Sequence, residues 1–215
     1  MYSDTFSAVS PKKPFSKARP DGGLVKRSAL FLDRDGVINI DRGYVCAQDQ
    51  VEFVGGIFDL CRSATELGYL VIVVSNQAGI GRGYYSEQDF LALTEWMCKV
   101  FHERGASLTK VYYCPFHPDH GVGSYKRESS FRKPGPGMIL QAAAEFDIDV
   151  RRSVLVGDKE TDILAGVAAG VGCNLLYRGR AEAGPSDRPA GATSVIEKLI
   201  EAVPFLNMQV AEVTR

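Results

Sequence analysis

The sequence predicts an α/β fold, a doubly wound parallel sheet, and three features carry that prediction. An apolar segment at 29–32 ends abruptly on paired acids, as a buried strand does at the carboxyl edge of a sheet. The segment 70–74 is rich in β-branched residues without polar alternation, which is typical of a central parallel strand covered on both faces. From Ser28 onward, apolar runs alternate with amphipathic stretches, the pattern of strands separated by helices.

The other elements follow in chain order from the same periodicities. Short apolar runs predict further strands at 111–113, 154–156 and 174–177. Helices are expected where apolar residues keep a helical spacing that ends at a glycine or a proline. The predicted helices cover 57–67, the segment from Ser86 to Gly105, 136–146, 163–169 and 194–203.

Composition limits the classes of protein to consider. The chain has 215 residues, 45% of them hydrophobic and 24% charged, and a net charge of −1, which gives no support for a nucleic-acid or membrane-surface partner. No apolar run approaches membrane-spanning length, and the beginning of the chain lacks the apolar core of a signal peptide. Five scattered cysteines fit free thiols in a reducing compartment. We therefore expect a cytoplasmic protein.

The chain divides into two parts of different composition. Residues 1–27 are rich in Ser, Lys, Arg and Pro and show no apolar period, so they predict a flexible N-terminal arm. Residues 28–215 carry the strand and helix pattern and predict one domain, with no internal repeat.

Chemically useful side chains follow the predicted strands where each one ends. Asp33 and Asp35 come directly after the first strand; two carboxylates that lie close repel each other, so a bound cation is the simplest way to keep both ionised. The strand at 70–74 leads into Ser75 and a glycine-rich loop with Arg82, which suits an oxyanion. The strand at 154–156 again leads to an acid, Asp158.

The order of these groups along the chain is an acid pair, a hydroxyl, a lysine (Lys133) and an acid. This order resembles the haloacid dehalogenase superfamily of phosphotransferases, from about Ser28 to Tyr177. Four segments are similar to one branch of it, which contains D-glycero-D-manno-heptose 1,7-bisphosphate phosphatases and histidinol-phosphate phosphatases. They are 33–39, 75–83, 132–138 and 157–162.

The resemblance, together with the chemistry, implies a role for each group. Asp33 would attack phosphorus and form an aspartyl-phosphate, and Asp35 would act as general acid and then as general base. Mg²⁺ would bind Asp33, the backbone carbonyl of Asp35, and Asp158. Ser75 and Lys133 would hold the phosphoryl oxygens.

The interval from Asp33 to Ser75 leaves no room for a large lid, so the resemblance implies a capless enzyme whose loops select the substrate. Two roles stay open: Asp162 orients Asp158 or caps a helix, and Lys159 contacts phosphate or pairs with a carboxylate. The residues predicted to bind substrate are Asn76, Gln77, Arg82, Arg132, Lys159, Asp41 and Tyr44.

These expectations define a leading function and two alternatives. The leading hypothesis is a Mg²⁺-dependent phosphatase that removes the 7-phosphate of a heptose 1,7-bisphosphate, in nucleotide-heptose synthesis. Histidinol-phosphate hydrolysis shares the same chemistry. A catalytically silent sugar-phosphate binder is disfavoured because the nucleophile, the acid/base, the lysine and the metal acid are all present. The expected partner is a small phosphorylated sugar, and we expect a monomer.

One loop departs from the pattern of the branch, whose members typically carry a structural zinc loop of Cys-x-His and Cys-x-Cys. Here Phe116 occupies the usual histidine position, and Ser129 to Phe131 stand where the cysteine pair should be. Structural zinc needs four ligands, and the local candidates are Cys114, His117 and His120. We therefore expect no structural zinc, and a loop held by packing of Phe116 and Phe131.

Overall fold

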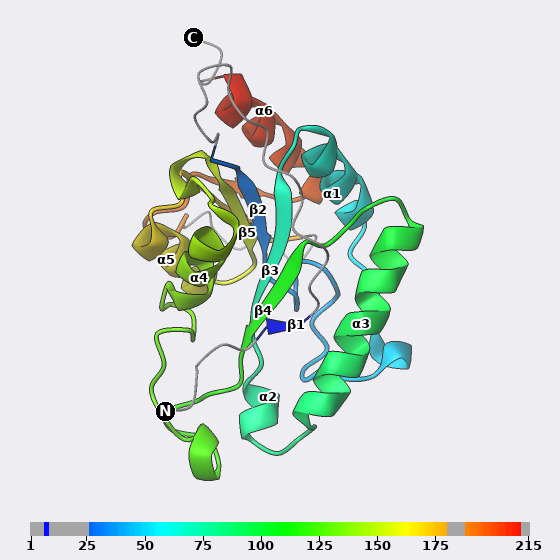
Figure 1. The fold of residues 1–215 in the computed structure, drawn as a ribbon, viewed down its shortest axis with the longest axis vertical. Helices are drawn as coiled ribbons and strands as arrows, with labels where there is room; N and C mark the ends of the chain where they lie inside the picture. The colour runs from blue at the N-terminus through cyan, green and yellow to red at the C-terminus, as the bar shows by residue number, and fades with distance from the viewer. Residues whose placement is uncertain (1–6, 9–25, 180–187, 212–215) are drawn as a thin grey trace.

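The computed structural model describes residues 7–8, 26–179 and 188–211, and within them one sheet organises the molecule (Figure 1). Its strand order is β1-β4-β3-β2-β5-β6-β7; β2 to β7 run parallel, and the two-residue β1 pairs antiparallel with β4. The strands are β1 (Ser7–Ala8), β2 (Ala29–Leu32), β3 (Leu70–Asn76), β4 (Lys110–Cys114), β5 (Val154–Gly157), β6 (Cys173–Tyr177) and β7 (Ser194–Ile196).

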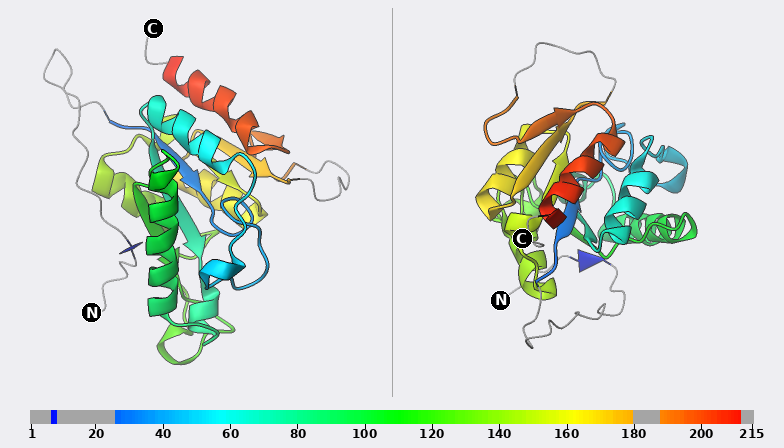
Figure 2. Two further views of the ribbon diagram at one scale, coloured as in Figure 1. Left: turned by 90° about the vertical axis from the view of Figure 1, so that its right-hand side faces the viewer. Right: turned by 90° about the horizontal axis from the view of Figure 1, so that it is seen from above.

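Helices cover both faces of the sheet, as the sequence predicts (Figures 1 and 2). Side chains alternate along β2, so Leu30 and Leu32 face one hydrophobic core while Ala29 and Phe31 face the other. The first core is completed by α1 (Ile57–Glu66), α3 (Glu87–Glu103), η4 (Leu199–Ala202) and α6 (Val203–Ala211). The second is completed by α4 (Gly137–Phe146) and α5 (Glu160–Ala169). The predicted fold class is confirmed.

The shorter helical segments lie in the connections. They are η1 (Gln48–Gln50), α2 (Ala78–Gly81), η2 (Gly123–Tyr125) and η3 (Val150–Arg152). Between β2 and β3 the chain forms only η1, α1 and connecting turns, so no separate domain is inserted there and the core is capless as predicted. Among the described residues, no helix is long and apolar enough to cross a membrane.

The end of the chain corrects one prediction. Residues 194–203 were expected to form a single helix ended by Pro204, but Ser194–Ile196 is β7, which pairs in parallel with β6. The β-branched pair Val195 and Ile196 suits an edge strand, and tertiary pairing outweighs local helical spacing. Pro204 lies in the first turn of α6, where a missing N–H costs nothing. Most of the predicted arm, 1–27, lies outside the described residues.

The sheet order brings the polar strand ends together. β2 lies between β3 and β5, and Leu32 pairs with both Val73 and Val156. The carboxyl ends of these three parallel strands therefore meet at one edge. Because the chain winds outward from β2 in both directions, this edge is also where α/β sheets form ligand-binding crevices.

Candidate active site

A cleft of about 510 Å³ opens at this edge of the sheet, and the sequence-predicted catalytic and substrate-binding residues all line it. Those residues are Asp33, Asp35, Asp41, Tyr44, Ser75, Asn76, Gln77, Arg82, Arg132, Lys133 and Lys159. Gly43, Ala78, Gly79, Tyr85, Thr161 and Asp162 complete the lining. Asp158, the predicted metal ligand, groups with Asp33 and Asp162.

Lys133 is the centre of the cleft floor, a name we give to Asp33, Asp158, Asp162 and Lys133. Its Nζ lies 2.8 Å from Asp33 Oδ1 and 2.6 Å from Asp162 Oδ1, and it donates a hydrogen bond to the carbonyl of Val74 at 2.8 Å. Only 4% of Lys133 is exposed. A buried ammonium with three anionic or carbonyl partners holds both carboxylates in place.

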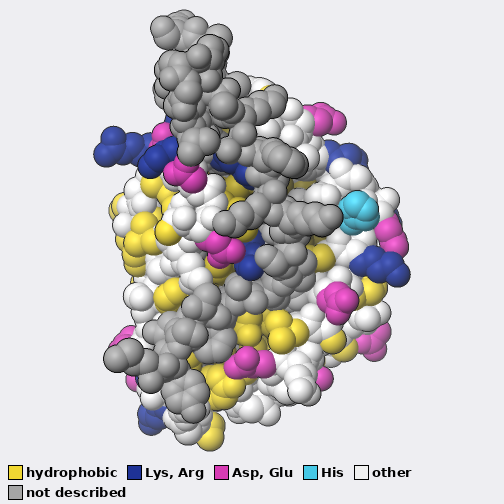
Figure 3. Space-filling view, in the orientation of Figure 1, with side chains coloured by type: hydrophobic (Ala, Val, Ile, Leu, Met, Phe, Trp, Pro, Cys, Tyr) yellow, Lys and Arg dark blue, Asp and Glu magenta, His cyan; other side chains and the backbone are white. Residues whose placement is uncertain are grey.

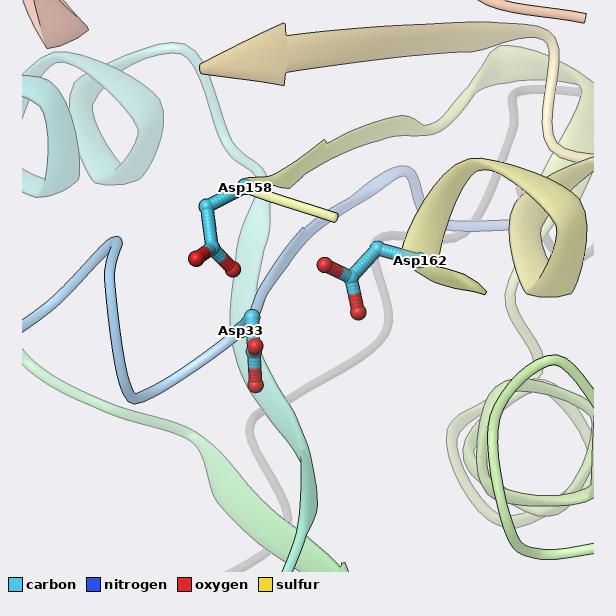
Figure 4. A group of neighbouring side chains, drawn as sticks. All are labelled: Asp33, Asp158 and Asp162. Carbon is cyan, nitrogen blue, oxygen red and sulfur yellow. The ribbon is translucent and has the colours of Figure 1, made fainter. Parts of the chain in front are cut away.

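The three carboxylates of the floor lie close to one another (Figure 4). One ligand oxygen from each of Asp33, Asp158 and Asp162 lies within 4.8 Å of the others. Burial raises the pKa of Asp33 to about 7; Lys133 opposes this, and the neighbouring carboxylates of Asp162 and Asp158 add to it. Burial also raises the pKa of Asp158 to about 6, opposed chiefly by Lys159. The floor therefore has three carboxyl groups for one lysine, and a bound cation would favour their ionised forms.

These residues fit a divalent cation. Asp158 Oδ1 is buried and has no hydrogen-bond partner, as expected of an oxygen reserved for a metal. The adjoining turn leaves room for Asp158 because it carries Gly36, with φ +98°; a Cβ there would lie 2.2 Å from Asp158 Oδ2. Hard carboxylate oxygens are the ligands that Mg²⁺ prefers in proteins.

Both carboxylate oxygens of Asp162, by contrast, contact protein groups. Its Oδ2 accepts a hydrogen bond from the backbone N–H of Lys159 at 3.0 Å, at the beginning of α5, while Oδ1 contacts Lys133. Of the two roles left open by the sequence, helix capping is the one that the contacts of Asp162 show directly.

Asp35 is held from three sides. Arg34, which is 2% exposed, donates through Nε and Nη2 to both carboxylate oxygens, at 2.8 to 3.1 Å. Asn39 Nδ2 donates to Oδ1 at 3.0 Å and Gln77 Nε2 donates to Oδ2 at 3.1 Å. Ser75, at the end of β3, receives the second hydrogen bond of the Gln77 amide, at 2.8 Å. Asp35 and Ser75 are thus fixed by the same side chain.

Asn76, at the end of β3, connects this strand to the loop before α4. Its Nδ2 donates to the carbonyl of Lys133, and its Oδ1 accepts from the N–H of Lys133, both at 3.0 Å. This reciprocal pair holds the Lys133 backbone against β3. Asn76 lines the cleft, as predicted, and the structure gives it a further contact that no sequence pattern indicated.

The cleft rim, which we define as Asp41, Tyr44, Arg82 and Lys159, is held by exposed contacts. Lys159 Nζ lies 3.0 Å from Asp41 Oδ2, so in this structure it pairs with a carboxylate, one of the two roles left open. Arg82 Nη1 donates to the Tyr44 hydroxyl at 2.8 Å. All four residues line the cleft.

The loop after β4 is packed as the sequence predicts. Phe116 is 4% exposed, and Phe131 is partly buried against the second core. The Arg127 guanidinium lies 3.9 Å from the centre of the Phe116 ring, and the Tyr125 hydroxyl donates to Glu87 at 2.6 Å. Both phenylalanines therefore serve the anchoring role expected of them.

The candidate zinc ligands of this loop do not gather as the floor carboxylates do. His117 Nδ1 accepts hydrogen bonds from the backbone N–H groups of Asp119 and His120, each at 3.2 Å. Among the described residues, the carboxylates of the floor are brought to metal-binding distance, and Cys114, His117 and His120 are not.

Sequence reasoning missed three residues that hold the predicted site residues in place. Arg34 and Asn39 hold Asp35, and Tyr85 donates a 2.6 Å hydrogen bond to Gln77 Oε1. The sequence did carry a signal for Arg34, because a cation between Asp33 and Asp35 is placed to pair with a neighbouring carboxylate. Tyr85 had none, because its contact depends on how α2 packs.

Comparison with known proteins agrees with this geometry. The HAD-hydrolase-like family model matches residues 130–202. A Burkholderia mallei protein named D-glycero-alpha-D-manno-heptose-1,7-bisphosphate 7-phosphatase is 55% identical, over 85% of this chain and 95% of its own length. A Vibrio cholerae protein named for the beta anomer is 47% identical, over 71% of this chain and 82% of its own length.

Two solved structures share the fold. The D,D-heptose 1,7-bisphosphate phosphatase of B. bronchiseptica, solved with magnesium and phosphate, superimposes with a TM-score of 0.72 at 27% identity, covering 85% of this chain and 99% of that one. A HAD-like phosphatase from Mesorhizobium loti gives a TM-score of 0.78 at 28% identity, covering 97% and 96%. With the curated relatives, they show that this chain, a phosphoric monoester hydrolase, belongs to the D-glycero-D-manno-heptose-1,7-bisphosphate 7-phosphatase family of HAD-like hydrolases.

Proposed function

We propose that this protein is a Mg²⁺-dependent phosphatase that removes the 7-phosphate of D-glycero-D-manno-heptose 1,7-bisphosphate in nucleotide-activated heptose synthesis. The observation that carries the proposal is the cleft floor, where a buried lysine contacts Asp33 and Asp162 and an unpartnered oxygen of Asp158 lies nearby. The names of the curated relatives supply the substrate.

Asp33 is the proposed nucleophile. It lies at the end of β2, buried, with Oδ1 held by Lys133 and by the backbone N–H of Arg34 at 2.7 Å. That leaves its other oxygen for the attack on phosphorus, which forms an aspartyl-phosphate and releases the sugar oxygen. A carboxylate whose position is fixed in this way loses little freedom on reaching the transition state.

Asp35 is the proposed general acid and base. It gives a proton to the leaving sugar oxygen, then takes one from the water that hydrolyses the aspartyl-phosphate. Its carboxylate is fixed by Arg34, Asn39 and Gln77, so its position is set before substrate enters. Mg²⁺, when bound by Asp33, Asp158 and the backbone carbonyl of Asp35, would offset the charge of the phosphoryl oxygens.

Ser75 and Lys133 are proposed to contact the non-bridging oxygens of the phosphoryl group. Both are buried and line the same cleft, where a fixed hydroxyl and a fixed ammonium act at low dielectric. For a substrate with a second phosphate, the cations that line the cleft outside its floor offer binding groups. These are Arg82, Arg132 and Lys159.

The proposed substrate is a small phosphorylated sugar, and we expect the enzyme to act as a cytoplasmic monomer. On the face that Figure 3 shows, the cationic and anionic side chains of the described residues are interspersed.

A substrate comparison tests the proposal. Phosphate release is measured with Mg²⁺ on the α and β anomers of heptose 1,7-bisphosphate and on histidinol phosphate. We expect kcat/KM for at least one heptose anomer to exceed that for histidinol phosphate by about 100-fold or more, because the rim cations meet a second phosphate only in the bisphosphate. Preference for histidinol phosphate would overturn the substrate assignment, and no hydrolysis of any of the three would overturn the enzyme assignment.

A further inference from the structure

Tyr85 lines the cleft and is linked to the catalytic groups through one side chain, Gln77. It is 8% exposed, and its hydroxyl donates to Gln77 Oε1 at 2.6 Å. Gln77 is 2% exposed, and its Nε2 donates in turn to Ser75 Oγ and to Asp35 Oδ2. A continuous chain of hydrogen bonds therefore runs from the tyrosine through the amide to the carboxylate.

The chemistry of these groups fixes which way the Gln77 amide points. Asp35 carboxylate oxygens accept hydrogen bonds, so the amide NH₂ must face them, and the amide oxygen then faces Tyr85. Among the described residues, this oxygen accepts its hydrogen bond from the Tyr85 hydroxyl. Burial raises the pKa of Tyr85 above its ordinary value, so the hydroxyl keeps its proton and stays a donor.

The packing of α2 shows that this contact is built into the fold. Gly79 lies against the tyrosine ring, and a Cβ at that position would lie 2.2 Å from Tyr85 Cε1. Only glycine lets the ring approach α2 closely enough for its hydroxyl to meet Gln77, which immediately precedes that helix.

We propose that Tyr85 is a positioning residue that holds the Gln77 amide so that the amide fixes the carboxylate of Asp35 for proton transfer to the leaving group. The inference rests on the proposed phosphatase mechanism, and it assigns Tyr85 no contact with substrate. Without the hydroxyl, the Gln77 amide oxygen loses this partner, and only the bonds of Nε2 to Asp35 and Ser75 restrain the terminal torsion, which has a broad minimum. Arg34 and Asn39 still hold Asp35 from the other side, so the loss is partial.

The test uses leaving groups of different quality. A sugar oxygen needs a proton as it departs, whereas nitrophenolate does not. For Tyr85→Phe we expect kcat/KM on the heptose bisphosphate to fall about 10-fold, a fraction of what general acid catalysis contributes. On p-nitrophenyl phosphate it should fall less than about 2-fold. Tyr112→Phe is the matched control: this buried tyrosine donates an equally short 2.6 Å bond, to Glu145, outside the cleft.

A double-mutant cycle with Gln77→Met shows whether the effect passes through the amide. We expect Tyr85→Phe to cost less than about 2-fold when Gln77 is already replaced, because the two residues act as one unit. Gln77→Met alone should show the same dependence on leaving group. If Tyr85→Phe folds poorly, this variant still tests whether the amide acts on proton transfer to the leaving group. Melting curves verify that each variant is folded at the assay temperature.

Three results would overturn the proposal: unchanged activity of Tyr85→Phe on the sugar substrate, an equal loss on both substrates, or effects of the two substitutions that multiply. If the wild-type enzyme does not hydrolyse the heptose bisphosphate, it is the proposed function that fails. The same comparison is then made with an alkyl phosphate that the wild type does hydrolyse.

Discussion

On the cleft floor, Lys133 contacts Asp33 and Asp162 through side chains that are at most 8% exposed, whereas at the rim the side chains of Lys159 and Asp41 are 54% and 36% exposed. Each pair has similar chemistry and similar distances, but the surroundings differ. Breaking a buried ion pair costs about 3–5 kcal/mol, and an exposed pair is worth about 0–1 kcal/mol. The floor is therefore rigid and suited to the reaction, while the rim can exchange its internal partners for those of a substrate.

The largest expected effect is on the floor, from Asp33→Asn. The amide keeps the shape of the carboxylate but is not a nucleophile, so turnover should fall by several orders of magnitude. The variant should still fold, because Asp162 remains as a carboxylate partner of Lys133. The matched control is Asp59→Asn, on the exposed face of α1, which should leave turnover unchanged. A variant at position 33 that keeps roughly a tenth of the activity would contradict the assignment of the nucleophile.

Replacing the two lysines separates floor from rim directly. Lys133→Met leaves two buried carboxylates without their cation, so the free energy of unfolding should drop by about 3–5 kcal/mol and activity should be lost. Lys159→Met should change stability by less than about 1 kcal/mol and should act mainly by raising KM. Urea unfolding curves and steady-state kinetics measure both. Equal losses of stability in the two variants would remove the distinction between floor and rim.

A smaller effect distinguishes two acids of the floor. Asp158→Asn should lower activity by about 100-fold at low Mg²⁺, with partial recovery at high Mg²⁺ because other ligands remain. Asp162→Asn removes a partner of Lys133 and a helix cap, so extra Mg²⁺ should not restore it. The measurement is the activity of each variant as a function of Mg²⁺ concentration. If Mg²⁺ restores activity to neither variant, or to both equally, Asp158 is not a distinct metal ligand.

The smallest effect is expected in the loop after β4. With Phe116 and Phe131 packed, we expect no stoichiometric zinc by elemental analysis. A chelator should stop catalysis by removing Mg²⁺ and shift the melting temperature by less than about 2 °C, whereas loss of a structural zinc would lower it strongly. One zinc per chain would overturn this prediction and make Cys114, His117 and His120 the first ligands to replace.

The sequence by itself determined the fold class and the groups available for the reaction. Apolar runs that stop at polar residues mark strand ends, and parallel strand ends meet at one edge, so Asp33, Ser75 and Asp158 were placed near one another by local pattern alone. The roles of these residues in catalysis are still predictions. The one element given the wrong type, at 194–203, failed because pairing with β6 outweighed helical spacing.

Only the tertiary structure decided how those groups are held. Asn76 meets Lys133 across 57 residues of sequence, Lys159 meets Asp41 across 118, and Gln77 meets Asp35 across 42. Such contacts depend on strand order and on how helices pack, and no local periodicity encodes them. Side-chain chemistry is a property of each residue, but the direction in which a buried side chain points is a property of everything packed around it.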